Sequence, residues 1–325
     1  MPAIPVIDLS ALATRRTDVV ATTLAAYRDV GFAYLEGHDV SDELVAQAFA
    51  GSQRFHAQPV EEKLRLQVNR WHRGYLPLAE SKIVASTIEK ATKPNRSESL
   101  MIMHEVAPGD PARADDPFAG PNQWPELEGF RSVVEAYERE LRRVAHTLVD
   151  VFGEALALPP ERLRERFAPP TTFLRLLHYP PQAPDAAGDE FGSAPHTDYG
   201  FVTILAQDDA GGLQVRTADG SAWIDVPPRP GAFVLNVGDV GQRWSNGLLR
   251  STPHRVVNRT GRDRYSIPYF FDPGAGADIG PFPECVGSGE PRFASETYGA
   301  YVTAKLDANH SYRAERGELQ ARETP

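Results

Sequence analysis

Cysteine is almost absent from this sequence: Cys285 is the one cysteine among 325 residues. An internal disulfide is therefore impossible, and no Cys-x-x-Cys pair is present for a zinc or redox site. No apolar run approaches the roughly 20 residues that span a bilayer. The first ten residues also lack the basic region and apolar core of a signal peptide. We therefore expect a cytoplasmic protein that does not cross a membrane.

Positive charge is also in short supply. The 34 Lys and Arg residues are outnumbered by 44 Asp and Glu residues, which gives a formal net charge of -10. No dense basic block is present. Nucleic-acid binding and adsorption to an anionic membrane both depend on clustered Lys and Arg. The sequence therefore predicts neither partner, and a monomer is the expected state.

The first half of the sequence carries mainly helical patterns. The clearest apolar stripe recurs at steps of three and four residues and predicts a helix over 129–156. Its members are Val134, Tyr137, Leu141, Val144, Leu148 and Phe152. Helices are also predicted over 17–30 and 41–57, the second with Ser41 as its N-cap, and a short helix is expected to end near Phe167.

Beyond residue 170, short apolar runs alternate with Gly, Pro, Asp and Asn turns. This spacing is typical of a β-sandwich or barrel and not of βαβ units. The predicted strands, including two in the N-terminal half, cover 4–9, 32–35, 173–178, 201–207, 212–215, 222–226, 232–237, 254–258 and 265–271. A helix over 295–309 and a charged, mobile tail over 313–325 are expected to follow. The expected plan is a helical N-terminal half packed on a C-terminal barrel as one cooperative unit.

Two residues in the segment 194–200 are candidate metal ligands. His196 and Asp198 are separated by one residue, so in extended backbone their side chains point to the same side. His254, which begins another predicted strand, can supply a third ligand. Two imidazoles and one carboxylate on one face leave three adjacent coordination positions open, which is characteristic of non-haem Fe(II) oxygenases. A His-x-Asp pair alone would more often be a surface turn.

A second group of residues suits a carboxylate ligand. Arg264 and Ser266 lie at the start of a predicted strand, ten residues after His254, and again share a face. A guanidinium and a hydroxyl together can hold one carboxylate, because the charge-assisted fork fixes the plane of the carboxylate. Tyr179, just before a Pro-Pro turn, can add a phenol donor. No catalytic residue is predicted beyond the metal centre.

These residues, in this order, resemble the 2-oxoglutarate/iron oxygenases of the isopenicillin-N-synthase-like group. The resemblance covers most of the chain. Besides His196-Thr-Asp198, His254 in Ser-Thr-Pro-His-Arg, and Arg264-x-Ser266, the matching stretches are Ile4–Leu9, Gly31–Tyr34 with Gly37-His38, Phe55–Lys63, Gly74-Tyr75, Gln207–Asp209, Gly211–Val215, Asn236–Asp239 and Trp244–Gly247. Each stretch is weak alone, but all of them in family order argue against a chance match.

The resemblance implies a fold as well as a chemistry. The fold is a double-stranded β-helix, or jelly roll, so the protein would be mainly β with flanking helices, a helical N-terminal region and a C-terminal helix. An N-terminal dioxygenase region would cover 1–120, a long helix and connector 121–170, the jelly-roll core 171–275, and a C-terminal helix and tail 276–325.

The resemblance also implies roles for the candidate site residues. Fe(II) would be bound by His196, Asp198 and His254, and the distal carboxylate of 2-oxoglutarate by Arg264 and Ser266 with help from Tyr179. The implied reaction uses O2 and converts 2-oxoglutarate to succinate and CO2. It is coupled to oxidation of a small organic molecule, most often by hydroxylation, with desaturation, epoxidation or ring closure as alternatives. Many relatives carry Asn where this chain has Leu177, so the co-substrate pocket is expected to differ there.

Two other functions fit the same residues. In isopenicillin N synthase and similar relatives, the Arg and Ser serve the substrate's own carboxylate or another co-substrate, and 2-oxoglutarate is not used. An inactive jelly-roll binding protein would keep the fold without the chemistry. The substrate is expected to be determined by the N-terminal half and by loops near 75–82 and 98–103. The loop 181–195 and the helix near Tyr298 and Tyr301 are expected to cover the site.

Overall fold

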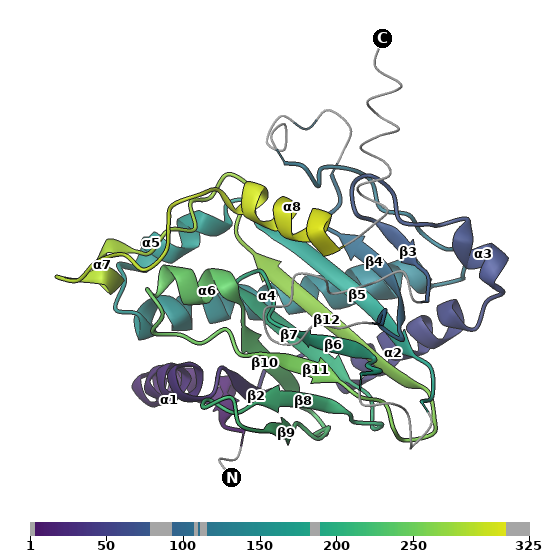
Figure 1. The fold of residues 1–325 in the computed structure, drawn as a ribbon, viewed down its shortest axis with the longest axis horizontal. Helices are drawn as coiled ribbons and strands as arrows, with labels where there is room; N and C mark the ends of the chain where they lie inside the picture. The colour runs from purple at the N-terminus through teal and green to yellow at the C-terminus, as the bar shows by residue number, and fades with distance from the viewer. Residues whose placement is uncertain (1–3, 79–92, 107–109, 111–115, 183–188, 310–325) are drawn as a thin grey trace.

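Two β-sheets form the centre of the molecule (Figure 1). The computed structural model describes residues 4–78, 93–106, 110, 116–182 and 189–309. In spatial order, the larger sheet comprises β1 (Val6–Asp8), β2 (Phe32–Glu36), β10 (Phe233–Val237), β7 (Val202–Gln207), β12 (Arg264–Asp272), β5 (Thr171–Tyr179), β4 (Glu98–Met103) and β3 (Gly74–Leu76). The smaller sheet comprises β6 (Ser193–His196), β11 (His254–Val256), β8 (Leu213–Arg216) and β9 (Trp223–Asp225). The mainly β, jelly-roll prediction is confirmed.

Helices cover the face of the larger sheet that points away from the smaller sheet. The longest described helix, α4 (Phe130–Ala155), lies behind β7 and β12 in Figure 1 and contacts both strands. The apolar stripe predicted for it is buried throughout. The other α-helices are α1 (Arg16–Asp29), α2 (Asp42–His56), α3 (Val60–Leu64), α5 (Pro160–Arg164), α6 (Asp239–Trp244), α7 (Pro283–Val286) and α8 (Tyr298–Asn309).

Local signals placed several helix ends correctly. The Ser41 hydroxyl accepts a hydrogen bond from the Leu44 amide at 3.1 Å, as an N-cap should. The helix predicted to start at Ser295 starts instead at Tyr298. The short helices α3, α6 and α7 were not predicted, because one or two turns are too short to show an apolar period.

The expected helical N-terminal half packed on a C-terminal barrel is observed, and strands of the N-terminal half also join the larger sheet. Strands β1 to β4 come from that half and extend the larger sheet at both of its edges. Strand β4 lies where a substrate loop was expected. It pairs antiparallel with β5, and all six of its residues are buried. A strand buried on both faces does not alternate polar and apolar residues, so the pattern gave no strand signal.

Two apolar cores hold these layers together. One lies between the larger sheet and the helices, and the second lies between the two sheets. Within the described ranges, none of the helices combines the length and the hydropathy needed to cross a bilayer. The tail over 313–325 lies outside the described residues.

Candidate active site

The small sheet brings two distant histidines together. His196 ends β6 and His254 begins β11, and the two residues are direct cross-strand partners with ring centroids 4.2 Å apart. Asp198 follows β6 by two residues. Its Oδ1 atom lies 3.8 Å from Nε2 of His196 and 3.7 Å from Nε2 of His254. One atom from each side chain falls within 4.8 Å of the others, so the three could share a metal ion.

Backbone carbonyls orient both imidazole rings. Nδ1 of His196 lies 2.8 Å from the Ala194 carbonyl, and Nδ1 of His254 lies 3.3 Å from the Thr252 carbonyl. A carbonyl only accepts, so each Nδ1 must carry the proton. Each Nε2 is then unprotonated and has a free lone pair that can bind a metal ion. In metal-binding histidines, a hydrogen bond from the other ring nitrogen commonly fixes the tautomer and the ring orientation in this way.

The carboxylate is oriented in the same way. Oδ2 of Asp198 accepts hydrogen bonds from the Thr203 hydroxyl at 2.5 Å and from the Asn236 amide at 2.7 Å. Oδ1 is left facing the imidazoles. The sequence gave Asn236 no role, although it stands in one of the stretches on which the resemblance depended, and Thr203 was not singled out. A polar residue at a cavity-facing position of an otherwise apolar strand was the available signal for Thr203.

Burial and charge set the protonation of these groups. Burial, followed by the charge of His254, lowers the pKa of His196 to about 4. For Asp198, burial alone would raise the pKa, but the two imidazoles and the hydrogen bonds to Oδ2 lower it overall. At neutral pH the His196 ring is therefore neutral and the carboxylate is ionised. These are the states in which both bind metal.

The structure also brings together the three residues predicted to hold a carboxylate, the clamp residues Arg264, Ser266 and Tyr179. Arg264 is fully buried. Its Nε donates to the Gly211 carbonyl at 2.5 Å, and its Nη2 lies 3.5 Å from the Gln207 side-chain oxygen. Its guanidinium carbon stacks 4.7 Å from the centre of the Tyr179 ring. The Ser266 hydroxyl lies 3.4 Å from the Tyr179 hydroxyl.

One hydrogen-bond donor of Arg264 is unsatisfied within the described residues. Nη1 of Arg264 is buried and has no hydrogen-bond partner among the described residues. An unsatisfied buried donor costs about 1–3 kcal/mol, and more when it is charged. An anionic acceptor at this position would remove that cost, so the clamp fits the carboxylate of a bound acid.

A single cavity connects the metal triad to the clamp. It encloses about 180 Å³ and is lined by His196, Asp198, His254, Arg264, Ser266 and Tyr179, among others. Its other walls are largely apolar, with Phe173, Leu177 and Phe270 facing inward, and Arg175 adds a second cation. Sequence reasoning missed Arg175, although its position four residues before Tyr179 on β5 puts both on one face.

The expected cover is partly visible. Helix α8, yellow in Figure 1, contributes Tyr298, Val302, Leu306 and Asn309 to the cavity wall. Tyr301, the second residue expected there, instead donates its hydroxyl to Asp239. The central part of the loop 181–195 lies outside the described residues, so its role as a cover stays a prediction.

Comparison with known proteins identifies the family. The 2OG-Fe(II) oxygenase superfamily matches residues 170–273, and the N-terminal family described as non-haem dioxygenase in morphine synthesis matches residues 4–127. A 2-oxoglutarate-dependent dioxygenase of Monascus ruber, citB, is 36% identical over 263 residues, which are 78% of each chain. The chain belongs to the 2OG-Fe(II) oxygenase superfamily.

Further relatives span almost the whole chain. Homoarginine-6-hydroxylase 2-ODD-233 of Oryza sativa is 32% identical over an alignment that covers 94% of this chain and 97% of the length of the hydroxylase. Among solved structures, a full-length Neurospora crassa protein in complex with alpha-KG and thymine superimposes with a TM-score of 0.83. It is 27% identical and covers 94% and 96% of the two chains. The 325-residue chain is therefore itself a 2-oxoglutarate-dependent dioxygenase that oxidises small molecules with Fe(II) and O2.

Proposed function

We propose that His196, Asp198 and His254 bind the Fe(II) ion. The proposal is supported by the convergence of two Nε2 atoms and one carboxylate oxygen, each oriented by a hydrogen bond on its other atom. Two imidazoles and a carboxylate on one side of a metal leave the opposite positions for reactants. The described residues therefore suit the group that the family uses.

The second part of the proposal concerns 2-oxoglutarate. Arg264 and Ser266 would hold its distal carboxylate, and Tyr179 would stack beside the guanidinium and hydrogen-bond Ser266. The observation that supports this most directly is the buried Nη1 of Arg264, which lacks a partner among the described residues, in a side chain that lines the cavity shared with the triad. When bound, iron, 2-oxoglutarate and O2 supply the oxidising chemistry, and succinate and CO2 are the by-products.

Leu177 forms the wall next to this clamp. It is the cross-strand partner of Ser266 and packs into the core between the two sheets. At the position where many relatives carry Asn, this chain therefore offers an apolar contact and no hydrogen bond. We propose that 2-oxoglutarate is held here by fewer polar contacts than in those relatives.

The remaining cavity is assigned to the organic substrate. The cavity-facing side of β5 carries Phe173 and Arg175 beyond the co-substrate residues, and Phe270 of β12 lies opposite Phe173. Nη2 of Arg175 donates to the Ser99 hydroxyl at 2.9 Å. We propose that the substrate packs on the two phenyl rings and that Arg175 orients it through an acceptor group, with hydroxylation as the most direct outcome.

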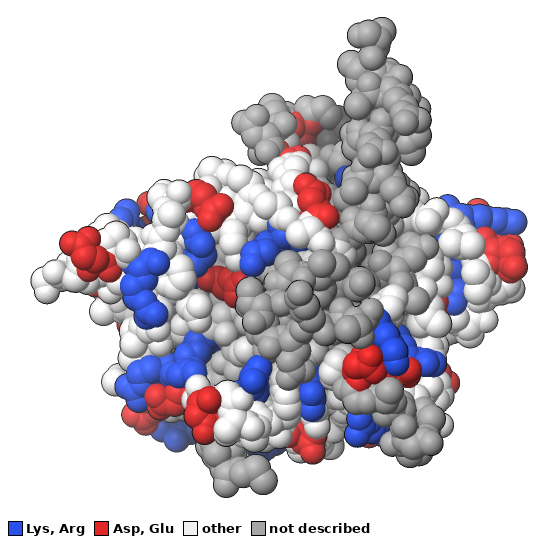
Figure 2. Space-filling view, in the orientation of Figure 1, with Lys and Arg blue, Asp and Glu red and all other residues white. Residues whose placement is uncertain are grey.

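The expected partners and regions stay proposals. In the face drawn in Figure 2, Lys and Arg alternate with Asp and Glu over the described residues, and no continuous basic area stands out among them. The mixed charges support the proposal that the protein binds neither nucleic acid nor an anionic membrane surface, and we also propose that it is a cytoplasmic monomer. We also keep the division into an N-terminal region over 1–120, a connector over 121–170, a core over 171–275 and a C-terminal part over 276–325.

The assignment is tested by metal binding and by turnover. Fe(II) binding should be measured by calorimetry without oxygen, and succinate formation from 2-oxoglutarate should be measured in air. Asp198→Ala should abolish both, because the site loses its only anionic ligand. His146→Ala, an exposed histidine on α4, is the matched control and should change neither. Retained iron affinity in Asp198→Ala would remove that residue from the ligand set.

A further inference from the structure

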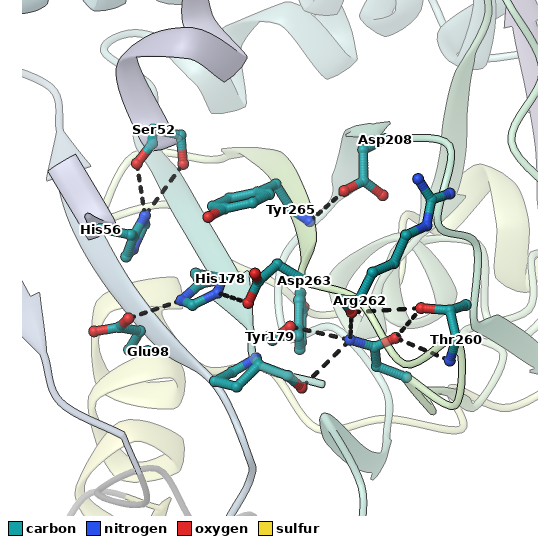
Figure 3. Close-up of polar contacts among 12 residues, drawn as sticks. Ser52, His56, Glu98, His178, Tyr179, Asp208, Thr260, Arg262, Asp263 and Tyr265 are labelled. Atoms are coloured by element: carbon teal, nitrogen blue, oxygen red, sulfur yellow. Dashed lines mark hydrogen bonds and ion pairs between the residues drawn. The ribbon is translucent and has the colours of Figure 1, made fainter. Parts of the chain in front are cut away.

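A partly buried polar cluster lies on the face of β5 opposite to its cavity-lining residues. Figure 3 shows His178 at its centre, held between two carboxylates, of which Glu98 is buried and Asp263 is exposed. Its Nδ1 lies 2.8 Å from Oε1 of Glu98, and its Nε2 lies 2.8 Å from Oδ1 of Asp263. The Tyr265 ring stacks on the imidazole at 4.9 Å with an angle of 18° between the planes. We call these four residues the His178 cluster.

The geometry favours a positively charged imidazole. A carboxylate that is ionised can only accept, so two carboxylates on the two ring nitrogens require a proton on each nitrogen. Burial lowers the pKa of His178, but the hydrogen bonds to Glu98 and Asp263 raise it overall. Glu98 keeps its own charge, because its pKa is lowered to about 2; its burial is outweighed by the bonds from His178, Lys63 and Tyr75.

The surrounding elements supply few other titrating groups. From α3, Lys63 is buried and lies 2.7 Å from Oε2 of Glu98, and from β3 the Tyr75 hydroxyl donates to the same oxygen. From α2, the His56 ring lies 5.5 Å from the His178 ring, and burial lowers its pKa to about 4. His56 is therefore neutral near pH 7, whereas the hydrogen bonds to Glu98 and Asp263 raise the pKa of His178 and favour its charged form.

The cluster is directly connected to the proposed co-substrate clamp through the backbone. His178 precedes Tyr179, Asp263 precedes Arg264, and Tyr265 separates Arg264 from Ser266. The clamp residues line the cavity, whereas His178 of β5 and Tyr265 of β12 point to the other side of these two strands, where Glu98 of the neighbouring strand β4 pairs with His178. Strands β5 and β12 pair antiparallel here, with Arg264 opposite Tyr179 and Tyr265 opposite His178. A shift of either strand end would move the clamp.

We propose that His178 is a positioning residue for 2-oxoglutarate. By bridging Glu98 and Asp263, its imidazolium fixes the ends of β5 and β12 so that Arg264 and Tyr179 meet the co-substrate in one geometry. The inference depends on the clamp assignment under the proposed function. It adds a pH dependence, because the bridge exists only while the ring carries both protons.

A second support for the clamp does not titrate. The Asn258 side-chain amide donates to the carbonyls of Tyr179 at 3.0 Å and Arg262 at 2.9 Å. These two hydrogen bonds keep the strand ends together when the imidazole loses its charge. Deprotonation should therefore weaken 2-oxoglutarate binding without unfolding the site.

The direction of the pH effect follows from the raised pKa. His178 contributes fully below the pKa that it has in the unfolded chain, and its contribution is lost as the pH rises through its folded value. The dissociation constant of 2-oxoglutarate for the wild-type protein should therefore increase between pH 6 and pH 9. Residues that support a ligating group are typically worth roughly 10- to 100-fold. With Asn258 still in place, we expect the lower end, roughly 10-fold.

The test measures 2-oxoglutarate binding to Fe(II)-loaded protein by anaerobic calorimetry between pH 6 and pH 9. His178→Gln should bind weakly at every pH, with the wild-type increase removed. His178→Arg keeps a cation with donors on two sides and should restore binding while staying independent of pH. His146→Gln removes an exposed histidine and should reproduce the wild-type profile.

Three results would overturn the proposal. The first is a wild-type profile retained in His178→Gln, and the second is a profile that is flat in the wild type. The third is a His178→Gln variant with a lower melting temperature but wild-type affinity, which would make the cluster purely structural. If His178→Gln does not fold, the wild-type and His178→Arg profiles decide. Failure of the wild-type protein to bind 2-oxoglutarate would contradict the proposed function instead.

Discussion

Replacing Arg264 by Met tests the clamp while keeping most of the side-chain volume. The wild-type side chain is buried and lines the cavity, and its Nη1 has no hydrogen-bond partner among the described residues. Loss of a hydrogen bond to a charged group costs about 1.5–3 kcal/mol. This corresponds to a roughly 10- to 150-fold weaker affinity for 2-oxoglutarate. Iron affinity should be unchanged, because no metal-ligand candidate is altered.

The same difference can be read from thermal stability. At a 2-oxoglutarate concentration of about 100 times the wild-type dissociation constant, binding stabilises the wild-type protein by about 2.7 kcal/mol. If the Arg264→Met dissociation constant is about 100-fold higher, the same concentration stabilises the variant by only about 0.4 kcal/mol. The assay is the melting temperature of the Fe(II)-loaded protein, without oxygen, with and without 2-oxoglutarate.

The Arg264→Met substitution should also lower the stability of the protein in the absence of 2-oxoglutarate. Nε of Arg264 donates to the Gly211 carbonyl, so the Met variant leaves that carbonyl without this donor and should melt earlier even without 2-oxoglutarate. The control is Arg262→Met, two residues away, where the side chain is half exposed and pairs with Asp209 at 3.0 Å. A full 2-oxoglutarate-induced shift in Arg264→Met would refute the clamp.

Three further changes have defined outcomes. Trp244 is fully buried, and Trp244→Ala should lower the free energy of unfolding by roughly 3–5 kcal/mol in denaturant titrations; a loss below about 1 kcal/mol would contradict its place in the core. Because the folded pKa of Glu98 is lowered from 4.5 to about 2, its contribution is full above pH 4.5 and is lost as the pH falls toward 2. The melting temperature of Glu98→Gln should therefore fall below the wild type at pH 7 and approach it in acid, and a difference independent of pH would refute this. Arg175→Met should raise the KM of the organic substrate and leave 2-oxoglutarate affinity unchanged, whereas an unchanged KM would exclude Arg175 from substrate binding.

Features with a local period were predictable from the sequence. The stripe on α4 and most of the C-terminal strands depend on residues a few positions apart and appear as predicted, whereas β6, which carries His196, was not among the predicted strands. Strand β4 was missed because it is buried on both faces, and its neighbours β5 and β3 are distant in sequence or very short. The sheet membership of β1 to β4 is a long-range pairing that no local pattern encodes.

In the candidate site, too, the features that depend on local spacing were predictable, whereas those that depend on long-range contacts were not. The spacing of His196 and Asp198, and of Arg264 and Ser266, is local, so each pair could be recognised. What orients these side chains is not local. Asn236 reaches Asp198 across 38 positions, and the carboxylates around His178 come from positions 80 and 85 residues away. Only the folded sheets bring such groups within hydrogen-bond distance.

The two halves of the active site belong to different sheets. The candidate metal ligands follow or begin strands of the smaller sheet, whereas the clamp projects from β5 and β12 of the larger sheet. The distance between the candidate metal ligands and the Arg264 guanidinium is therefore set by the side chains that separate the sheets. Phe32 of the larger sheet packs edge-on against His254 at 5.2 Å, and Leu177 packs in the same core as Val215 and Val256. The Leu177 side chain offers no polar contact to the cavity, but it extends the apolar core between the two sheets, which keeps these two groups of residues in register.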